Sequence, residues 1–248
     1  MRIPAITGLI ERRILANYRI DPEVMARFLP PPFRPKLASG YAIGGICLIR
    51  LEGIRPKFLP LPWGIRSENA AHRIAVEWEQ DGRLRDGVYI PRRDTDSWLN
   101  TFAGGTLFPG IHYHASFTVK ESGGHFFVQL ISDDGDTKVL VSGRVAERLP
   151  ESSVFSTLAA ASEFFESGSL GYSLTRTNGR YHGLELSCKN WHVEPLDVDS
   201  VESSFFENES AFPRGSAAFD CALLMRGIQH EWHGREDLCC SETTGVPR

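Results

Sequence analysis

The sequence lacks the patterns that would place the chain in a membrane, on nucleic acid or around a structural metal. Its longest apolar stretch, residues 41–49, contains two glycines and ends at Arg50, so it is far too short to cross a bilayer as a helix. The formal net charge is −4, which provides no overall basic field for nucleic acid or anionic lipid. The five cysteines show no CxxC spacing of the kind that holds zinc.

The N-terminal segment also lacks the features of an export signal. Residues 1–21 carry Glu11, Arg12, Arg13 and Arg19 and contain no uninterrupted apolar core. An odd number of cysteines without metal-type pairing favours reduced thiols. We therefore expect a cytoplasmic protein that binds a small molecule rather than nucleic acid or a membrane.

The chain has the length of one large domain and shows no repeat, low-complexity tract or linker. We expect a single domain over residues 1–235, followed by a flexible tail over residues 236–248. Three short helices are predicted. Asp21 and Pro22 have the residue types of an N-cap and first turn for a helix over residues 22–29. Asp94 or Thr95 is expected to cap a helix that ends at Gly104-Gly105, and Ser152 or Ser153 to precede one over residues 154–165.

Most of the remaining chain has the pattern of short strands separated by turn residues. Gly44-Gly45, inside the first strand, indicates a bulge or a close approach of two backbones. Many strands with few helices predict a mainly β (α+β) fold, either a barrel or a sandwich. The expected strands are residues 41–51, 72–78, 87–90, 113–119, 126–131, 139–147, 170–176, 184–188, 191–194 and 217–226.

Several short motifs, in this order and spacing, resemble one known family. They are Asn17-Tyr18-Arg19-Ile20-Asp21-Pro22-Glu23, Gly44-Gly45, Ser67-Glu68-Asn69, Val88-Tyr89-Ile90, Phe108-Pro109, Ser204-Phe205-Phe206, Phe212-Pro213 and Asp220-Cys221-Ala222-Leu223. On these motifs the chain is identified as a member of the DUF2071 family, within the acetoacetate decarboxylase-like superfamily. The resemblance covers nearly the whole chain. It implies an antiparallel β-barrel with a few short flanking helices, and it implies that the chain can form a homo-oligomer.

The same resemblance implies a partly altered active site. In the decarboxylases an arginine near the N-terminus, two glutamates and a pair of lysines surround an internal cavity. The arginine corresponds to Arg12 or Arg13, and the second glutamate corresponds to Glu68. The first glutamate falls near Gly44 or Gly45, so it is missing here.

The lysine pair of the decarboxylases is also missing. It corresponds to Gly110-Ile111, and a rival alignment places Arg92-Arg93 there instead. A Schiff base needs an amine that can lose its proton, which arginine and glycine do not supply. The five lysines of the chain lie elsewhere, at positions 36, 57, 120, 138 and 189. If the protein is an enzyme, we expect it not to be a Schiff-base decarboxylase.

Glu68, His72 and Arg73 form the first candidate group for acid–base chemistry. A helical turn would put Glu68 and His72 on one face, and a strand would put Glu68, Ala70 and His72 on one face. We predict Glu68 and His72 to be catalytic and Arg73 to bind a substrate carboxylate. The alternative is a buried ion pair that holds this segment to the sheet.

His112 and His114 form the second candidate group. Their spacing on a strand directs both imidazoles to one side. We predict that His112 is catalytic and that His114 binds substrate. A metal site with His72 or Glu68 as a third ligand remains an open alternative, but no carboxylate lies beside the pair, so we predict no metal and no cofactor.

Arg92 and Arg93 follow a predicted strand and precede two aspartates. Such a cluster is consistent with an anion clamp, but a solvated turn that caps a helix is the favoured interpretation.

Two functions of different classes fit these residues. The first is a small-molecule-binding barrel that acts on a small organic acid by lyase or hydrolase chemistry, with Arg12 or Arg13 holding the acidic group. The second is a non-catalytic ligand-binding or sensing protein on the same scaffold. An enzyme that uses Glu68 needs this side chain in a closed cavity, whereas a binding protein tolerates it in an ion pair at the rim.

Overall fold

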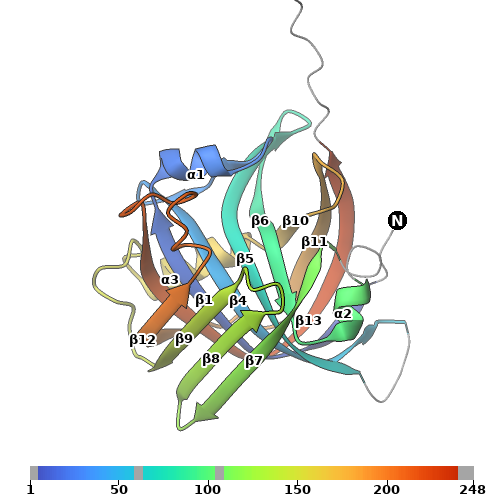
Figure 1. Cartoon of the computed structure of the whole chain (residues 1–248), viewed down its shortest axis with the longest axis vertical. Coiled ribbons are helices and arrows are strands. Elements are labelled where there is room, and N and C mark those ends of the chain that lie inside the picture. The colour runs from blue at the N-terminus through green and yellow to red at the C-terminus, as the bar shows by residue number, and fades with distance from the viewer. Residues whose placement is uncertain (1–4, 59–63, 104–108, 240–248) are drawn as a thin grey trace, which may run out of the picture.

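The computed structural model describes residues 5–58, 64–103 and 109–239, and these residues form mostly β-structure (Figure 1). A single sheet contains thirteen strands in the described part of the chain. The strands are β1 (Ile6–Ile20), β2 (Arg34–Pro35), β3 (Leu37–Ala38), β4 (Tyr41–Pro56), β5 (Ile65–Gln80), β6 (Arg83–Thr95), β7 (His112–Ser122), β8 (His125–Ser132), β9 (Lys138–Val145), β10 (Leu170–Leu174), β11 (Arg180–Cys188), β12 (Glu194–Ser203) and β13 (Ala217–Cys239).

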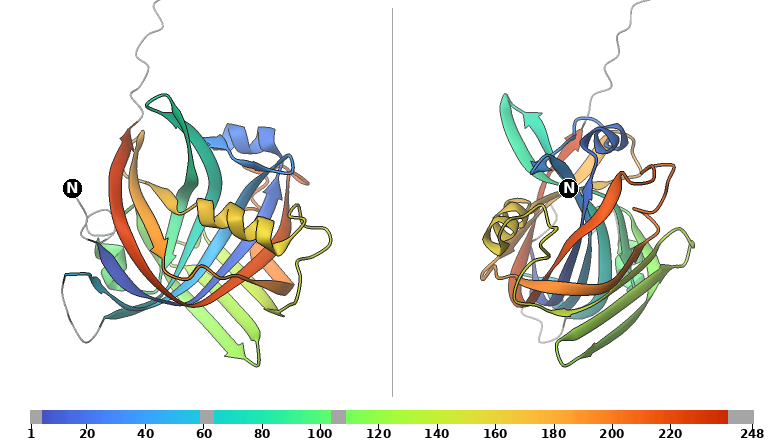
Figure 2. Two further views of the ribbon diagram at one scale, coloured as in Figure 1. Left: turned by 180° about the vertical axis from the view of Figure 1, so that it is seen from behind. Right: turned by 90° about the vertical axis from the view of Figure 1, so that its left-hand side faces the viewer.

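The sheet closes into a ring around a shared wall of five strands. Strands β13, β1, β4, β5 and β6 run side by side in this wall, each antiparallel to the next. Two routes lead from β13 back to β6. One passes through β12, β9, β8 and β7, and the other passes through β11 and β10. Both routes reach β6 by a parallel pairing, and Figure 2 shows the two routes on different sides of the molecule.

The wall separates two apolar clusters, because successive side chains of a strand point to opposite faces of a sheet. One cluster contains Ile14 and Ile74 and packs against side chains of β8 and β9. The other contains Leu15 and Cys47 and packs against the helix α3 (Leu158–Ser167). Full burial of an aliphatic side chain of this size contributes about 2 kcal/mol to folding. Adjacent residues of a wall strand therefore meet different surroundings.

The first predicted helix is confirmed as α1 (Pro22–Phe28). The Asp21 carboxylate caps it, since Oδ1 accepts hydrogen bonds from the backbone N–H groups of Glu23 at 2.8 Å and Val24 at 3.1 Å.

The other two helices begin later than the sequence predicts. Asp94 and Thr95 end β6, and α2 (Trp98–Ala103) follows Ser97, whose hydroxyl accepts from the Asn100 backbone N–H at 3.3 Å. Thr157 caps α3. The Ser153 hydroxyl instead donates to the Asp220 carboxylate at 2.7 Å and accepts from the Phe155 backbone N–H at 3.2 Å, in the loop before the helix. Gly104-Gly105, expected to end α2, lies outside the described residues.

Several strands differ from expectation in extent, and β4, β5 and β6 are each longer than predicted. β1 occupies a segment in which no strand was predicted, because its charged residues obscure the period-two pattern. β13 continues to Cys239, so residues 236–239, expected in a flexible tail, belong to a strand. They are held there by β11, where Tyr181 pairs with Leu238 and Arg180 with Cys239. The strand expected over residues 191–194 instead begins at Glu194.

The close approach predicted at Gly44-Gly45 is present in the wall. A Cβ atom at Gly45 would lie 2.6 Å from the Ala16 carbonyl oxygen, and one at Gly44 would lie 2.9 Å from the ring of Phe206. Both distances are shorter than real Cβ contacts, so only glycine fits without a shift of its neighbours. Elsewhere in the described residues, no helix has the length and apolar character needed to span a membrane.

Candidate functional site

A cavity of about 140 Å³ lies between the wall and the β10–β11 route, with α3 at one side. This volume is close to that of a protein cavity that holds a benzene ring, so the ligand is small. The larger apolar side chains around the cavity are Ile49, Leu51, Ile54, Ile65, Val88, Ile90, Phe165, Leu184, Leu186, Trp191 and Trp232, and Ala70, Ala71 and Pro109 add smaller ones. Its polar side chains are Arg13, Cys47, Ser67, Asn69, Arg73, Arg93, Asp94, Asn100, His112 and Ser169.

Three arginines converge on this cavity from three wall strands. Arg13 comes from β1, Arg73 from β5 and Arg93 from β6. Within the described residues, none of the three forms an ion pair with a carboxylate. Arg13 donates from Nε to Cys47 Sγ at 3.2 Å, and Arg93 donates from Nε and Nη2 to the Ser173 hydroxyl at 3.1 and 3.0 Å. The carboxylate of the described lining, Asp94, is paired with Arg92, so the three cavity arginines have no carboxylate partner of their own.

Arg73 is the most buried of the three, with 5 % of its surface exposed. Its Nη2 donates to Asn17 Oδ1 at 2.5 Å, and its guanidinium lies 4.8 Å from the ring centroid of Phe165. Its Nε has no hydrogen-bond partner among the described residues. Burial lowers the pKa of Arg73 and that of Arg93 to about 10, so both remain charged at neutral pH.

The sheet register aligns further cavity residues in one row across the wall. Cys47 on β4 pairs with Ala71 on β5, Ala71 pairs with Arg93 on β6, and Arg93 pairs with His112 on β7. The small side chain of Ala71 leaves space between Cys47 and Arg93. Burial, and then the charge of Arg93, lower the pKa of His112 to about 3, so its imidazole is neutral at physiological pH.

Arg12 and Glu68 lie on the opposite face of the wall from this cavity. Arg12 Nη2 donates to Glu68 Oε2 at 2.6 Å, and Arg12 Nη1 donates to Glu121 Oε1 at 2.7 Å. Arg50 completes the group through its own hydrogen bond to Glu68. The two neighbours Arg12 and Arg13 thus separate: Arg13 faces the cavity, whereas Arg12 belongs to a buried ion-pair network.

His72 also lies on the opposite face, in an apolar environment. It is fully buried, with its ring centroid 4.6 Å from that of Phe205. Neither ring nitrogen has a hydrogen-bond partner among the described residues. Desolvation, and then the charge of Arg92, lower its pKa to about 3. His72 and the neighbouring Arg73 are therefore placed on different faces by the strand alternation.

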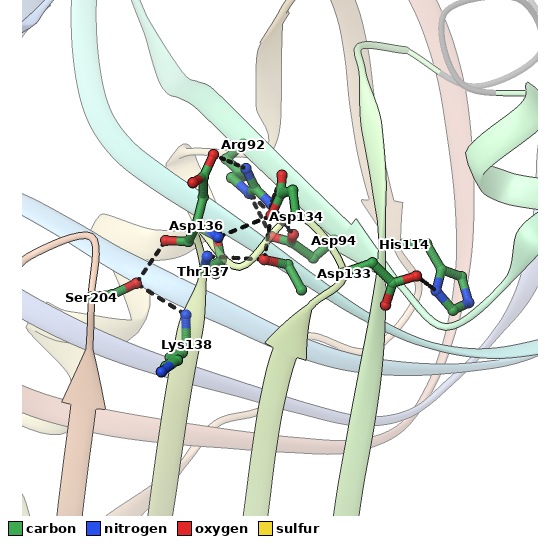
Figure 3. A network of polar contacts seen from close by, with 10 residues as sticks. Arg92, Asp94, His114, Asp133, Asp134, Asp136, Thr137, Lys138 and Ser204 are labelled. Carbon is green, nitrogen blue, oxygen red and sulfur yellow. Dashed lines mark hydrogen bonds and ion pairs between the residues drawn. The ribbon is translucent and has the colours of Figure 1, made fainter.

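His114 lies outside the group of described residues that line the cavity. Its Nδ1 is 2.8 Å from Asp133 Oδ2, and its ring stacks on Trp98 with the centroids 3.8 Å apart. Figure 3 shows His114 and Asp133 beside the network in which Arg92 binds Asp94 and Asp134. Only His112 of the predicted histidine pair reaches the cavity.

Arg92 and Arg93 separate in the same way as Arg12 and Arg13. Arg92 Nη2 donates to Asp94 at 2.9 Å and to Asp134 at 2.9 Å, which fixes the turn between β8 and β9 (Figure 3). Burial raises the pKa of Asp94 to about 6, against the opposing effect of Arg92. Among the described residues, no group of three or more His, Cys, Asp or Glu side chains is arranged to hold a metal ion.

The position aligned with the missing lysine has a backbone that disfavours any side chain. Gly110 has a φ of +80°, and a Cβ atom there would lie 2.5 Å from Ser173 Cβ. No lysine is found among the described residues that line the cavity.

Several polar cavity residues were not among the predicted site residues: Cys47, Ser67, Asn69, Arg93, Asp94, Asn100 and Ser169. β6 contains a bulge, since two steps on β5 from His72 to Ile74 correspond to three steps on β6 from Arg92 to Tyr89. The bulge changes the alternation, so the sequence pattern alone does not show which face Arg93 takes. For Cys47 the available signal was its position two residues after Gly45 on a strand next to Arg13.

Comparison with solved structures supports the fold. An acetoacetate decarboxylase from Legionella pneumophila superposes with a TM-score of 0.64 at 10% identity, covering 98% of this chain and 90% of that chain. The enduracididine biosynthesis enzyme MppR, complexed with the condensation product of pyruvate and imidazole 4-carboxaldehyde, gives 0.58 at 13% identity, covering 97% and 90%. An acetoacetate decarboxylase-like enzyme from Sphingomonas wittichii RW1 gives 0.58 at 12% identity, covering 96% and 93%.

Two sequence comparisons complete the picture. A search of curated proteins returned no significant match. The profile of the DUF2071 family, described as an uncharacterized conserved protein, matches residues 10–226. With this match across most of its length, on an acetoacetate decarboxylase-like fold, the chain belongs to the DUF2071 family.

Proposed function

We propose that this protein binds a small organic acid in the arginine-lined cavity and acts on it by lyase or hydrolase chemistry without a Schiff base. One observation carries the proposal: Arg13, Arg73 and Arg93 line a small cavity, and none of them is paired with a carboxylate of the described chain. A buried charge is costly unless it is paired, so a carboxylate ligand is the natural complement.

The rest of the lining defines the other end of the ligand. Trp191, Trp232 and Leu186 offer an apolar surface, so the preferred acid carries a small aliphatic or aromatic body. On the same fold, MppR is complexed with pyruvate, which is also a small carboxylate. In this proposal the closed ring serves as the expected β-barrel, with the ligand inside it.

The cavity also supplies polar groups for a reaction. His112 is neutral at physiological pH and can orient the bound acid through a hydrogen bond, but with a pKa of about 3 it is a weak base. Ser67, Asn69 and Asn100 add hydrogen-bond donors and acceptors. The proposal also places the protein in the reducing cytoplasm, because none of the four described cysteines forms a disulfide.

A non-catalytic binding protein is the second candidate, and one observation favours it. Glu68, the glutamate retained from the decarboxylase pattern, is held by Arg12 and Arg50 on the opposite face of the wall. It therefore does not face the cavity for the proton transfer expected of it, and His112, with a pKa of about 3, is too weak a base to replace it.

Calorimetric titration with benzoate and with benzamide tests the proposal. The two probes have nearly the same shape and differ in charge, so a carboxylate site should bind benzoate at least about tenfold more tightly. Arg13→Gln should abolish this preference, whereas Arg12→Gln, one residue away on the opposite face, should keep it in the folded fraction. Equal binding of the acid and the amide, across aliphatic and aromatic pairs, would refute the proposal. Conversion of a bound acid, followed by mass spectrometry, separates the enzyme from the binding protein.

A further inference from the structure

Cys47 differs from the other described cysteines in its surroundings. It lines the cavity with 7 % of its surface exposed, and its sulfur accepts a hydrogen bond from Arg13 Nε at 3.2 Å. Cys221 is fully buried behind Asn17, and burial raises its pKa to about 12. Cys188 and Cys239 are not among the cavity-lining residues.

The sheet register places Cys47 between arginines of both neighbouring strands. It pairs directly with Leu15 on β1 and with Ala71 on β5. Arg13 and Arg73 each lie two residues along from these partners, at the diagonal positions that long side chains reach. The sulfur also lies within electrostatic range of Arg73 and Arg93.

An independent observation indicates that an anionic ligand completes this group. Arg73 is 5 % exposed, it lines the same cavity, and its Nε has no hydrogen-bond partner among the described residues. A buried guanidinium that keeps an unused donor next to a cavity favours an anion as the missing partner. Arg73 and Cys47 lie at diagonal positions of neighbouring strands and line the same cavity, so a small acid bound to Arg73 is within reach of the Cys47 side chain.

We propose that Cys47 is a nucleophile that forms a covalent bond with small carboxylic acids carrying an electrophilic carbon. The proposal rests on the proposed function, since the arginines must first bind the carboxylate. The three arginines that surround the sulfur supply the positive charge that attracts such an acid to it. Holding the carboxylate beside the sulfur adds the advantage of proximity.

The chemistry needs no additional reagent. With an α,β-unsaturated acid, the sulfur electron pair forms a bond to the β-carbon, the π electrons of the double bond move to the α-carbon, and a proton adds there to replace the one lost by the thiol. With iodoacetate, the sulfur forms a bond to the methylene carbon, iodide leaves with the electrons of the carbon–iodine bond, and the thiol proton passes to solvent.

Competitive alkylation of the folded protein tests the inference. Iodoacetate and iodoacetamide are applied in separate time courses, and the modification of each cysteine is followed by peptide mass spectrometry. The ratio of the iodoacetate rate to the iodoacetamide rate should be at least about tenfold higher at Cys47 than at the exposed Cys239, because the positive cavity concentrates the anion. Arg73→Gln and Arg93→Gln should lower this ratio at Cys47 while the ratio at Cys239 stays constant.

The outcomes separate this inference from the proposed function. If benzoate binds in the cavity but Cys47 shows the same ratio as Cys239, or is not alkylated by iodoacetate, the nucleophile is refuted and the acid site stands. If Cys47 reacts but shows no preference for iodoacetate and benzoate does not bind, both fail. The comparison on the unchanged protein requires no variant to fold. Cys47→Ser should remove the adduct and keep benzoate binding.

Discussion

Arg73 donates a hydrogen bond from Nη2 to the Oδ1 atom of Asn17, at 2.5 Å, across the bare backbone of Gly45. The register explains this contact, because Asn17 on β1 and Arg73 on β5 both pair with Gly45 on the strand between them. A neutral amide therefore orients the guanidinium without cancelling its charge.

Replacing this amide by a carboxylate should weaken acid binding. Asn17→Asp keeps the side-chain shape but gives Arg73 an internal ion-pair partner, which then competes with the ligand. We expect the affinity for benzoate to fall by about tenfold, equivalent to about 1.4 kcal/mol. Calorimetry measures this directly. Asn17→Ala is the control, since it removes the oxygen and adds no charge, and its loss should be smaller. Unchanged affinity in Asn17→Asp would show that Arg73 does not bind the acid.

Glu68→Gln should affect stability rather than binding. The substitution leaves two arginines on the opposite face of the wall with less compensation, and loss of one partner from a buried pair costs about 3 kcal/mol. Urea unfolding should show this loss, while the benzoate affinity of the folded protein stays within a factor of about two. Glu121→Gln is the matched variant, and its cost should be smaller because this side chain is more exposed. Loss of benzoate affinity without loss of stability would show that Glu68 takes part in ligand binding.

His72 should make the protein less stable in acid. Its folded-state pKa of about 3 lies below the ordinary value of 6.5, so between these values the unfolded chain binds a proton that the folded chain does not. Its contribution is therefore complete above about pH 6.5 and is lost progressively as the pH falls towards 3.

The variant His72→Phe isolates this effect. A phenyl ring suits the contact with Phe205 and cannot be protonated. The difference in unfolding free energy between variant and wild type should therefore change by up to about 1.4 kcal/mol per pH unit in this interval. Urea titrations at several pH values measure the difference, in which the other titrating groups cancel. A difference that is constant with pH would show that His72 does not titrate in this way.

A lysine restored at position 110 should not restore Schiff-base chemistry. Gly110→Lys forces a side chain onto a backbone at φ +80° and against Ser173, so we expect a loss of more than about 1 kcal/mol of stability. Treatment with acetoacetate and borohydride should leave no reduced adduct at this residue. Gly82→Lys is the control, because it has a positive φ of 68° but nothing within 4 Å of the added Cβ. A trapped adduct would show that the backbone adapts.

Much of the fold was predictable because its signals are local. Asp21 followed by Pro22 is a typical N-cap and first turn, so α1 was predicted correctly. Gly44-Gly45 indicated the close approach of neighbouring groups that is found in the wall. β1 was missed because Glu11 and Arg12 look like surface residues in one dimension. Their neutralising partners come from strands distant in the sequence, as Glu68 and Glu121 do for Arg12.

The site was only partly predictable, because it too depends on contacts between strands that are distant in the sequence. Arg13, Arg73 and His112 were among the predicted residues and line the cavity together. Which member of each pair faces the ligand depends on the register of strands and on the bulge in β6, and neither is visible in the local sequence.

The wall between the two apolar clusters is a single sheet thick. Successive residues of a wall strand therefore alternate between contact with the cavity and contact with the opposite cluster. Along β5, Ser67, Asn69, Ala71 and Arg73 contact the cavity, whereas Glu68 and His72 belong to the opposite side. A substitution scan through this segment should therefore give alternating effects. Substitutions at the odd-numbered positions should change ligand affinity, and those at Glu68 and His72 should change the free energy of unfolding. The effect of substituting one residue of this segment therefore does not predict the effect of substituting its immediate neighbour.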